Sequence, residues 1–354
     1  MAALFTTPKR NEKTSGAHFA EPDVRLAHGS WRRVTRRIVA GAVCALTVSS
    51  LLMPSVSLAA EWVDVGGTQY YAAAGDEAGT WSWDGADDMK LNGYDGGTIK
   101  AAGKLNLSYG GDNTVTNNNG RGILVEDGAN ENAELNIQGG ASDTLNVTSS
   151  SDAIISIGDI NIDGAGTVNA TSTGFDAIDA KGDLTIKGSG NVNATGDSDG
   201  IRAGGNITID NSGTVTAKAF EEKGIQAIEN LTVKGGGKVE ASSIEKAAIL
   251  ADGGITISGG SQVKANSEKD AAVEAKGSLA ATNASLNANG VEYGVYAHKG
   301  ITLDHANVTV RASKGRYGGA IALFTFQDDI VVKNGSTVDA FAEGEVSAAF
   351  STRN

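Results

Sequence analysis

The chain has 354 residues, of which 48 are glycine and only 3 are proline, and aromatic residues make up 5%. This composition excludes collagen, which needs glycine at every third position, and is unlike an ordinary enzyme core. Acidic residues outnumber basic ones by 42 to 29, so the formal net charge is −13. Nucleic acid and anionic lipid are therefore poor partners, whereas cations and basic proteins suit such a surface.

The first 59 residues have the features of an N-terminal extension and a signal peptide. Two pairs of arginines precede an apolar run from Ile38, and Ser57 and Ala59 occupy the small-residue positions of a cleavage site. The alternative is an uncleaved membrane anchor, because the run to Ala60 is nearly long enough to span a bilayer. Cleavage leaves 21 basic and 39 acidic residues, a net charge of −18. We expect a protein that is secreted or at the cell surface, touching a membrane only through an uncleaved leader.

A three-part repeat fills most of the remaining chain. The first part is an apolar, polar, apolar tripeptide that recurs every 22 to 24 residues, with looser copies at Leu105, Leu135 and Ile330. Its regular copies start at Ile160, Leu184, Ile207, Leu231, Ile255, Leu279 and Ile301. The second part starts at Val168, Val192, Val215, Val239, Val263, Leu286 and Val308. The third part starts at Ile178, Ile201, Ile225, Ile249, Val273 and Val295.

Each tripeptide has the alternation of a strand with one buried face. Strands this short cannot form a sheet alone, so they must pair with the equivalent tripeptides one repeat away. The sequence therefore predicts an all-β, single-stranded parallel β-helix, or solenoid, over residues 103–354. It has about ten coils of 22–30 residues, stacked about 4.8 Å apart.

Residues at matched places in the repeat support this stacking. Small residues keep opposing walls of a narrow core close together. One inward column is Ala180, Ala203, Ala227, Ala251, Ala275 and Ala297, and another is Ala170, Ala194, Ala217, Ala241 and Ala265. An outward column is Thr185, Thr208, Thr232 and Thr256.

The two ends of the solenoid differ in sequence. Residues 60–102 break the repeat and contain Trp62, Trp81, Trp83, Tyr70, Tyr71 and Tyr94. We interpret this region as an N-terminal cap that covers the first coil, with a sugar-stacking site as the alternative. The C-terminal segment FAEGEVSAAFSTRN stops partway through a coil without a cap signal. Either the chain is a fragment, or a partner protein covers this uncapped edge.

The successive units DAIDAKGDLTIKGSGNVNA and DGIRAGGNITIDNSGTVTA resemble the right-handed parallel β-helix of the pectate-lyase-like superfamily. More narrowly, they are similar to exported bacterial β-helix proteins that bind carbohydrate. The resemblance covers residues 103–354 and implies a right-handed coil. It also implies calcium-assisted binding of acidic polysaccharide at the cell surface, without established catalysis. No functional motif of that family transfers residue by residue.

The outward columns contain no recognisable catalytic pair. A glycoside hydrolase needs two carboxylates about 5 to 9.5 Å apart. In the outward column of the third part, Asp179 and Glu274 are four coils apart, about 19 Å. We therefore predict no catalytic residue and no enzyme. A polysaccharide lyase using Arg202, one coil from Asp179, or a hydrolase remains the alternative.

Aspartates cluster just before the third part of the repeat. Asp152, Asp176 and Asp199 occupy equivalent positions, where stacked like charges would repel each other. Calcium would relieve this repulsion, so the three form a candidate calcium site. Ordinary turn chemistry is the alternative, since aspartate favours such bends and Lys223 takes the next place.

A second candidate site lies where the step from Val308 to Ile321 lengthens to 13 residues. Loops that leave a regular solenoid often carry its binding surface, and tyrosine with arginine can stack on and grip an acidic sugar. The candidate carbohydrate-binding residues are Tyr293, Tyr296, His298, Arg311, Arg316 and Tyr317. Aromatic side chains covering a ragged final coil are the alternative.

The leading hypothesis is an exported, surface-displayed β-helix that binds carbohydrate or serves as an adhesin. The second is a polysaccharide lyase or glycoside hydrolase. The third is a purely structural or ice-binding rod, which is disfavoured because Ala280 breaks the threonine column that ice would require.

Overall fold

The computed structural model describes residues 60–128, 132–315, 319–344 and 346–352. They all belong to one compact unit, Ser55–Asn354. Every helix or strand assigned in this part of the chain is a β-strand. These residues accordingly contain no helix of the length and hydropathy needed to cross a bilayer. The predicted leader, residues 1–59, lies outside them.

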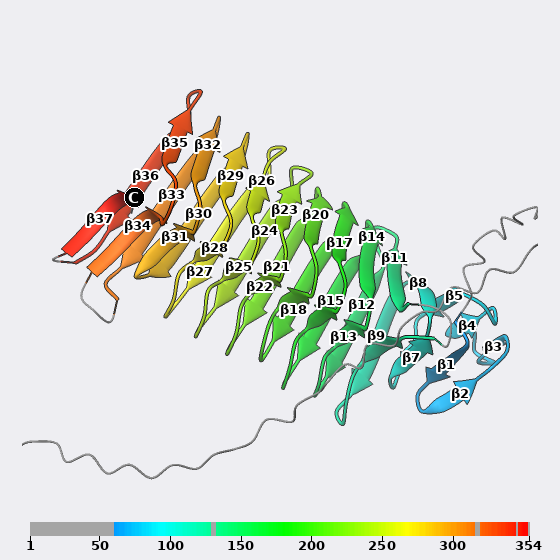
Figure 1. Ribbon diagram of the computed structural model, residues 1–354. Helices are drawn as coiled ribbons and strands as arrows, with labels where there is room; N and C mark the ends of the chain where they lie inside the picture. Colours follow the sequence, from blue (N-terminus) through cyan, green and yellow to red (C-terminus); the bar gives the residue numbers. More distant parts are fainter. Residues whose placement is uncertain (1–59, 129–131, 316–318, 345, 353–354) are drawn as a thin grey trace, which may run out of the picture. The chain divides into compact units, whose positions relative to one another are not determined.

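The strands form three sheets, and the chain visits the sheets in turn along each coil of a parallel β-solenoid of about ten turns (Figure 1). We call them the first, second and third sheets, after the three parts of the repeat. In spatial order, the first sheet consists of β3 (Ala74–Gly75), β4 (Trp81–Trp83), β5 (Asp88–Asn92), β8 (Lys104–Gly110), β11 (Glu134–Gly139), β14 (Asp159–Gly164), β17 (Leu184–Gly188), β20 (Ile207–Asn211), β23 (Leu231–Lys234), β26 (Ile255–Ile257), β29 (Leu279–Thr282), β32 (Ile301–Asp304) and β35 (Ile330–Lys333).

The second and third sheets complete each coil. The second sheet consists of β6 (Asp95–Gly96), β9 (Asp112–Asn117), β12 (Thr144–Ser149), β15 (Thr167–Ser172), β18 (Asn191–Gly196), β21 (Thr214–Ala219), β24 (Lys238–Ser243), β27 (Gln262–Ser267), β30 (Ser285–Val291), β33 (Asn307–Ser313) and β36 (Thr337–Ala342). The third sheet consists of β2 (Thr68–Tyr70), β1 (Trp62–Val65), β7 (Ile99–Ala102), β10 (Ile123–Glu126), β13 (Ile154–Ser156), β16 (Ile178–Ala180), β19 (Ile201–Ala203), β22 (Ile225–Ala227), β25 (Ile249–Ala251), β28 (Val273–Ala275), β31 (Tyr293–Ala297), β34 (Gly319–Thr325) and β37 (Val346–Thr352).

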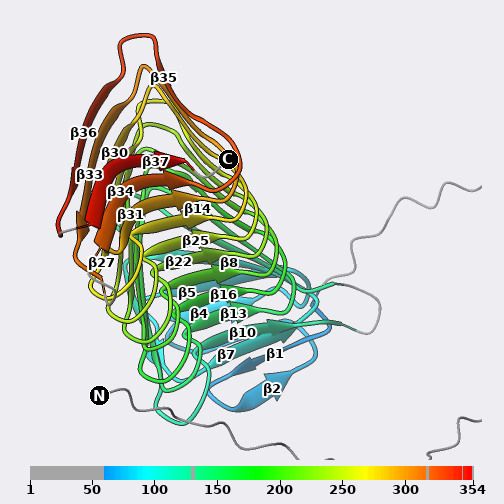
Figure 2. The ribbon, with the colours of Figure 1, turned by 60° about the vertical axis from the view of Figure 1, so that its left-hand side comes forward.

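The predicted register is confirmed wherever the repeat is regular. Ile207 pairs with Leu184 on one side and Leu231 on the other, as the spacing requires. Both alanine columns point inward, and all their members are 2% exposed or less. The stacked coils enclose one continuous apolar core (Figure 2). The alternation of each tripeptide is therefore explained by one wall facing this core and the other facing water.

Polar side chains reinforce the stacking on the outer faces. On the first sheet, the Asn136 side-chain amide donates to Asn106 Oδ1 at 2.9 Å, and Asn161 donates to Asn136 Oδ1 at 2.9 Å. On the second sheet, Asn193 donates to Asn169 in the same way. Such amide ladders satisfy each side chain through its equivalent in the next coil.

Glycine is required at one tight corner after the first sheet. Gly188 has a φ of +101°, and a Cβ there would lie 2.3 Å from the carbonyl oxygen of Gly164 in the preceding coil. Gly164 itself has a φ of +116°. A side chain at either place would clash with the backbone it stacks on, so these glycines fix both the bend and the close approach of successive coils.

The region predicted as a cap ends the parallel pattern. β1 pairs antiparallel with both β2 and β7, and β4 pairs antiparallel with β3 and β5. Trp81 and Trp83 of β4 are buried in the core, whereas Tyr71 is 72% exposed. The strands thus lie where a cap is expected, and its protective role stays a prediction.

Two expectations near the C-terminus were wrong. The last coil does not stop partway, because β37 pairs with β34 and supplies its third strand. The third strand before it also has a different register: Leu323, rather than Ile321, is the partner of Val295. Among the described strands, β35, β36 and β37 each lie at an end of their sheet. A protein partner at this edge stays a prediction.

Candidate functional site

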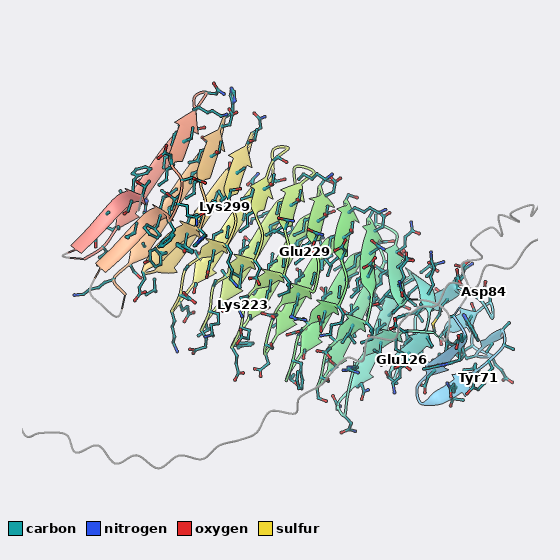
Figure 3. All side chains as sticks on the ribbon, in the orientation of Figure 1. Tyr71, Asp84, Glu126, Lys223, Glu229 and Lys299 are labelled. Carbon is teal, nitrogen blue, oxygen red and sulfur yellow. The ribbon has the colours of Figure 1, made fainter. Side chains whose placement is uncertain are left out.

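The outer face of the third sheet carries the most varied chemistry of the three faces. Its central column has the predicted order from Asp179 to Tyr296 and continues to Phe324, and each member pairs with the next. The column is Asp179, Arg202, Gln226, Leu250, Glu274, Tyr296 and Phe324. Figure 3 shows outward side chains along the strands of the solenoid. The column is charged in its early coils and aromatic in its late ones.

Three aromatic side chains of β31 and β34 form a cluster that we call the aromatic platform: Tyr293, Tyr296 and Phe324. The rings of Tyr296 and Phe324 are stacked, with centroids 5.4 Å apart and planes at 17°. Tyr293 lies 5.6 Å from Tyr296 and 5.4 Å from Phe324. All three side chains are partly exposed. The platform therefore forms a partly exposed aromatic surface whose base is fixed by parallel strand pairing.

A second stacked pair of rings lies beside the platform, on the residues that directly follow β31 and β34. The imidazole of His298 stacks on the ring of Phe326 with centroids 4.9 Å apart and planes at 17°. The Tyr296 hydroxyl lies 3.3 Å from His298 Nδ1, within hydrogen-bond distance. This contact holds Tyr296 against rotation out of the stack.

The platform borders an open hollow of about 380 Å³. Its lining consists of Asp270, Ala271, Glu274, Tyr293, Tyr296, Phe324 and Phe326. Burial raises the pKa of the Glu274 carboxyl, and the negative charge of Asp270 raises it further. Burial also raises the pKa of Tyr296, with Glu274 adding to the effect. The hollow thus combines aromatic side chains with carboxylates on the same side of the molecule.

The structure places some of the predicted site residues together, and their role in carbohydrate binding stays a prediction. Tyr293, Tyr296 and His298 are neighbours. Arg311 lies instead on the second sheet, where its guanidinium binds the Asp339 carboxylate at 2.6 Å and lines a different hollow. Arg316 and Tyr317 lie outside the described residues.

Sequence reasoning missed Phe324, Phe326, Asp270 and Glu274 as parts of this hollow. Phe324 was missed because the longer loop before β34 made the register of this strand against β31 ambiguous in the sequence. The signal was present, since Leu323, Phe324 and Thr325 repeat the pattern of Val295 to Ala297. Asp270 was missed because it lies in the turn before β28 and does not belong to an outward column of a strand.

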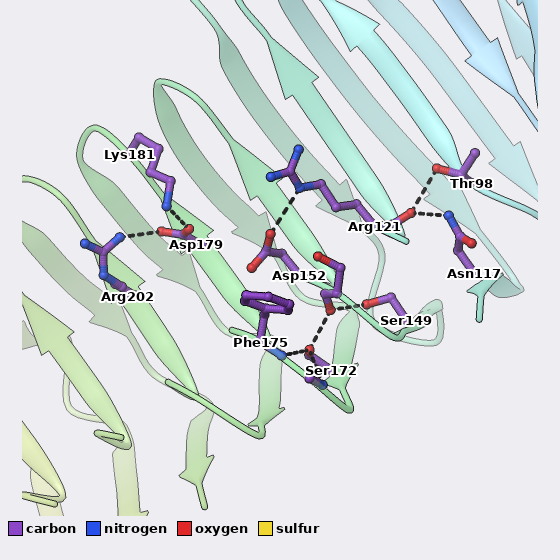
Figure 4. Close-up of polar contacts among 12 residues, drawn as sticks. Thr98, Asn117, Arg121, Ser149, Asp152, Ser172, Phe175, Asp179, Lys181 and Arg202 are labelled. Carbon is purple, nitrogen blue, oxygen red and sulfur yellow. Dashed lines mark hydrogen bonds and ion pairs between the residues drawn. The ribbon is translucent and has the colours of Figure 1, made fainter. Parts of the chain in front are cut away.

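A buried acidic cluster lies earlier on the third sheet, and Figure 4 shows two of its members, Asp152 and Asp179, with their basic partners. Carboxylate oxygens of Asp152, Asp176 and Asp179 lie within 4.8 Å of one another. Arg121 Nε donates to Asp152 Oδ2 at 3.1 Å. Asp179, expected to face outward into solvent, is only 1% exposed and is paired with both Lys181 and Arg202. Three basic side chains therefore compensate the charge of this cluster.

This arrangement does not fit a calcium site. Calcium takes about six to eight oxygen ligands in open coordination. Here both oxygens of Asp179 and one of Asp152 are bound by basic side chains, and Asp176 Oδ1 accepts the Asp199 backbone N–H at 2.8 Å. A cation would have to displace these groups. Calcium stays an untested prediction that the arrangement does not favour.

Asp199 belongs to a turn ladder rather than to the cluster. Its Oδ1 accepts the Lys223 backbone N–H at 2.7 Å, as Asp176 accepts that of Asp199. Each aspartate thus satisfies a buried backbone donor of the next coil, which is the turn chemistry considered as the alternative to calcium. Burial raises the pKa of Asp199 to about 7 and also raises that of Asp176.

A comparison with family models, with curated proteins and with solved structures found no match to this chain.

Proposed function

We propose that the protein is an exported, cell-surface β-solenoid that binds carbohydrate on the aromatic platform of its third sheet. The single observation that carries the proposal is the stack of Tyr296 on Phe324, flanked by Tyr293 and open to the hollow. The features of the leader and the resemblance to carbohydrate-binding members of the pectate-lyase-like superfamily support the same function. Adhesion to a glycan-coated surface would follow from it.

Aromatic rings suit a sugar because a pyranose has an apolar face of C–H groups. Tyrosine joins an apolar ring to a polar hydroxyl, so it can stack on that face and hydrogen-bond at its edge. Binding sites commonly combine aromatic surface with a few placed polar groups. The platform has this composition, with Glu274 and Asp270 as the polar groups.

The charge of the hollow narrows the class of sugar. An acidic polysaccharide needs arginine or lysine against its carboxylates. Of the two arginines expected to supply this contact, Arg311 is engaged with Asp339 on the second sheet, and Arg316 lies outside the described residues. The proposal therefore concerns a neutral or basic glycan rather than the acidic polysaccharide expected from the resemblance.

Tyr296→Ala tests the proposal. Because it removes the central ring while the strand pairing of β31 is kept, we expect at least about a tenfold loss of affinity for the glycans that bind wild-type protein. A glycan array followed by titration calorimetry measures this loss. Tyr71→Ala is the matched control, since Tyr71 is exposed at the opposite end of the solenoid.

Wild-type affinity in Tyr296→Ala, with an unchanged melting temperature, would contradict the proposal. Absence of any glycan signal for wild-type protein would contradict it as well.

Glycoside hydrolysis is the second candidate, favoured by one observation. Asp270 and Glu274 line the same hollow, and the raised pKa of Glu274 is the property expected of a general acid. Product analysis of each array ligand after long incubation separates the two functions. Shortened products that vanish in Glu274→Gln would establish hydrolysis, whereas intact ligands leave binding alone.

A further inference from the structure

The hollow beside the aromatic platform has carboxylates but no basic side chain among its lining residues. The lysines whose charges act on Glu274 are already paired. Lys276 binds Asp252 at 2.6 Å, and Lys223 is bound to Glu222. Among the described residues, the local charge of the hollow is therefore negative.

Glu274 is the carboxylate best placed to meet a ligand. Its neighbour Asp270 already accepts the Ala271 backbone N–H at Oδ1, 2.8 Å away. Within the described residues, the Glu274 carboxylate makes neither an ion pair nor a side-chain hydrogen bond, although the side chain is half-buried. Taking a carboxylate out of water without a partner is costly. A ligand cation beside Glu274 would recover that cost.

The rings favour the same kind of ligand. The face of an aromatic ring is negative, so it attracts a cation held within about 6 Å of its centre. Tyr293, Tyr296 and Phe324 line the hollow next to Glu274 and Asp270, with Tyr293 tilted against the stacked pair of Tyr296 and Phe324. Rings and carboxylates together form a binding environment for an organic cation.

We infer that this hollow binds the protonated amine of an amino sugar, with the sugar ring stacked on the aromatic platform and the ammonium group donating to Glu274. This inference rests on the proposed function and names its ligand class. An ammonium group has three N–H donors and matches a carboxylate flanked by aromatic rings. A bare metal ion does not match, because aromatic rings supply none of the oxygen ligands that it needs. An N-acetylated sugar does not match either, because its amide nitrogen carries no positive charge.

The test compares two oligosaccharides of equal length by titration calorimetry. One is a glucosamine oligomer, and the other is the N-acetylglucosamine oligomer. At near-neutral pH and about 150 mM salt, which screens the long-range field of the acidic protein, we expect the amine form to bind wild-type protein at least about tenfold more tightly. Glu274→Gln should remove this preference, because it weakens binding of the amine form by more than it weakens binding of the N-acetyl form.

Glu229→Gln is the matched control. Glu229 is an exposed carboxylate in the turn after β22, where it accepts the Asn206 side-chain amide at 2.7 Å and lies outside the lining of the hollow. This variant keeps the preference for the amine form if the preference arises at the hollow. Equal loss in both variants would indicate general attraction to an acidic surface and would overturn the inference.

The outcomes separate this inference from the proposed function. Equal binding of the two oligomers, with both weakened by Tyr296→Ala, overturns the amine and leaves carbohydrate binding in place. A preference for the amine that survives Glu274→Gln also overturns the inference. Failure of both oligomers to bind also overturns the inference. If Tyr296→Ala does not weaken the binding of a glycan that binds wild-type protein, the proposed function itself is wrong.

Discussion

The buried carboxylates of Asp176 and Asp199 have two opposing effects on the stability of the solenoid. Each accepts a backbone N–H of the following coil, which stabilises the turn. Each is also removed from water, which disfavours its charged form. The position of these aspartates was evident from the repeat. The burial of Asp179 was not, because it depends on neighbouring side chains such as Lys181 and Arg202 that the spacing of strands does not reveal.

Asp199→Asn should stabilise the protein above pH 7 by up to about 4 kcal/mol, from about three pKa units at about 1.4 kcal/mol each. The pKa of Asp199 is about 7 when folded, mainly through burial and then through Asp176 and Glu222, against the opposing charge of Lys223. The folded state therefore holds its proton over a range where the unfolded chain has released it. The contribution of this bound proton to the free energy of unfolding is complete below about pH 4. It is lost as the pH rises through about 7. Urea unfolding at several pH values measures the effect.

Asparagine can still accept the Lys223 backbone N–H, so the turn is kept. The variant should show a flatter stability profile between pH 4 and 7 than wild-type protein. Identical profiles would mean that Asp199 ionises normally in the folded state. A large uniform loss at every pH would mean instead that its weak contact with Arg202, at 3.9 Å, is the important one.

At the scale of elements, strands were predictable wherever coil length was constant. A period of 22 to 24 residues placed β14 to β33 in register, because each short strand has only its equivalent as a partner. The prediction failed at β34, where Ala320, Ala322 and Leu323 are all buried and interrupt simple alternation. Because the loop before β34 is longer than in the regular coils, the sequence allowed two registers for this strand. This error hid Phe324, and with it one third of the aromatic platform.

Ala227→Leu tests the meaning of the alanine column. Ala227 is fully buried between Ala203 and Ala251, so a larger side chain should force neighbouring strands apart and cost about 1–3 kcal/mol or more. Gln226→Leu, one residue earlier, adds similar apolar bulk on the outer face beside Leu250 and should be nearly neutral. Denaturant unfolding of both variants measures the difference. Equal effects would contradict the assignment of inner and outer faces.

At the scale of the whole solenoid, the site depends on stacking. Glu274, Tyr296 and Phe324 belong to β28, β31 and β34, three successive strands of the third sheet. No single coil contains the platform, and register between neighbouring coils is what brings the rings together. The acidic composition of the chain acts at the same scale, since it raises the local concentration of cationic ligands and repels anionic ones.

Hydrogen–deuterium exchange, with and without the glycan that gives the highest array signal, tests the central claim most directly. The account predicts slower amide exchange on binding in 270–274, 293–298 and 324–326, with no change in the early coils between β8 and β17. Tyr296→Ala should abolish this protection. Protection confined to the second sheet, or spread evenly over all coils, would contradict carbohydrate binding at the aromatic platform.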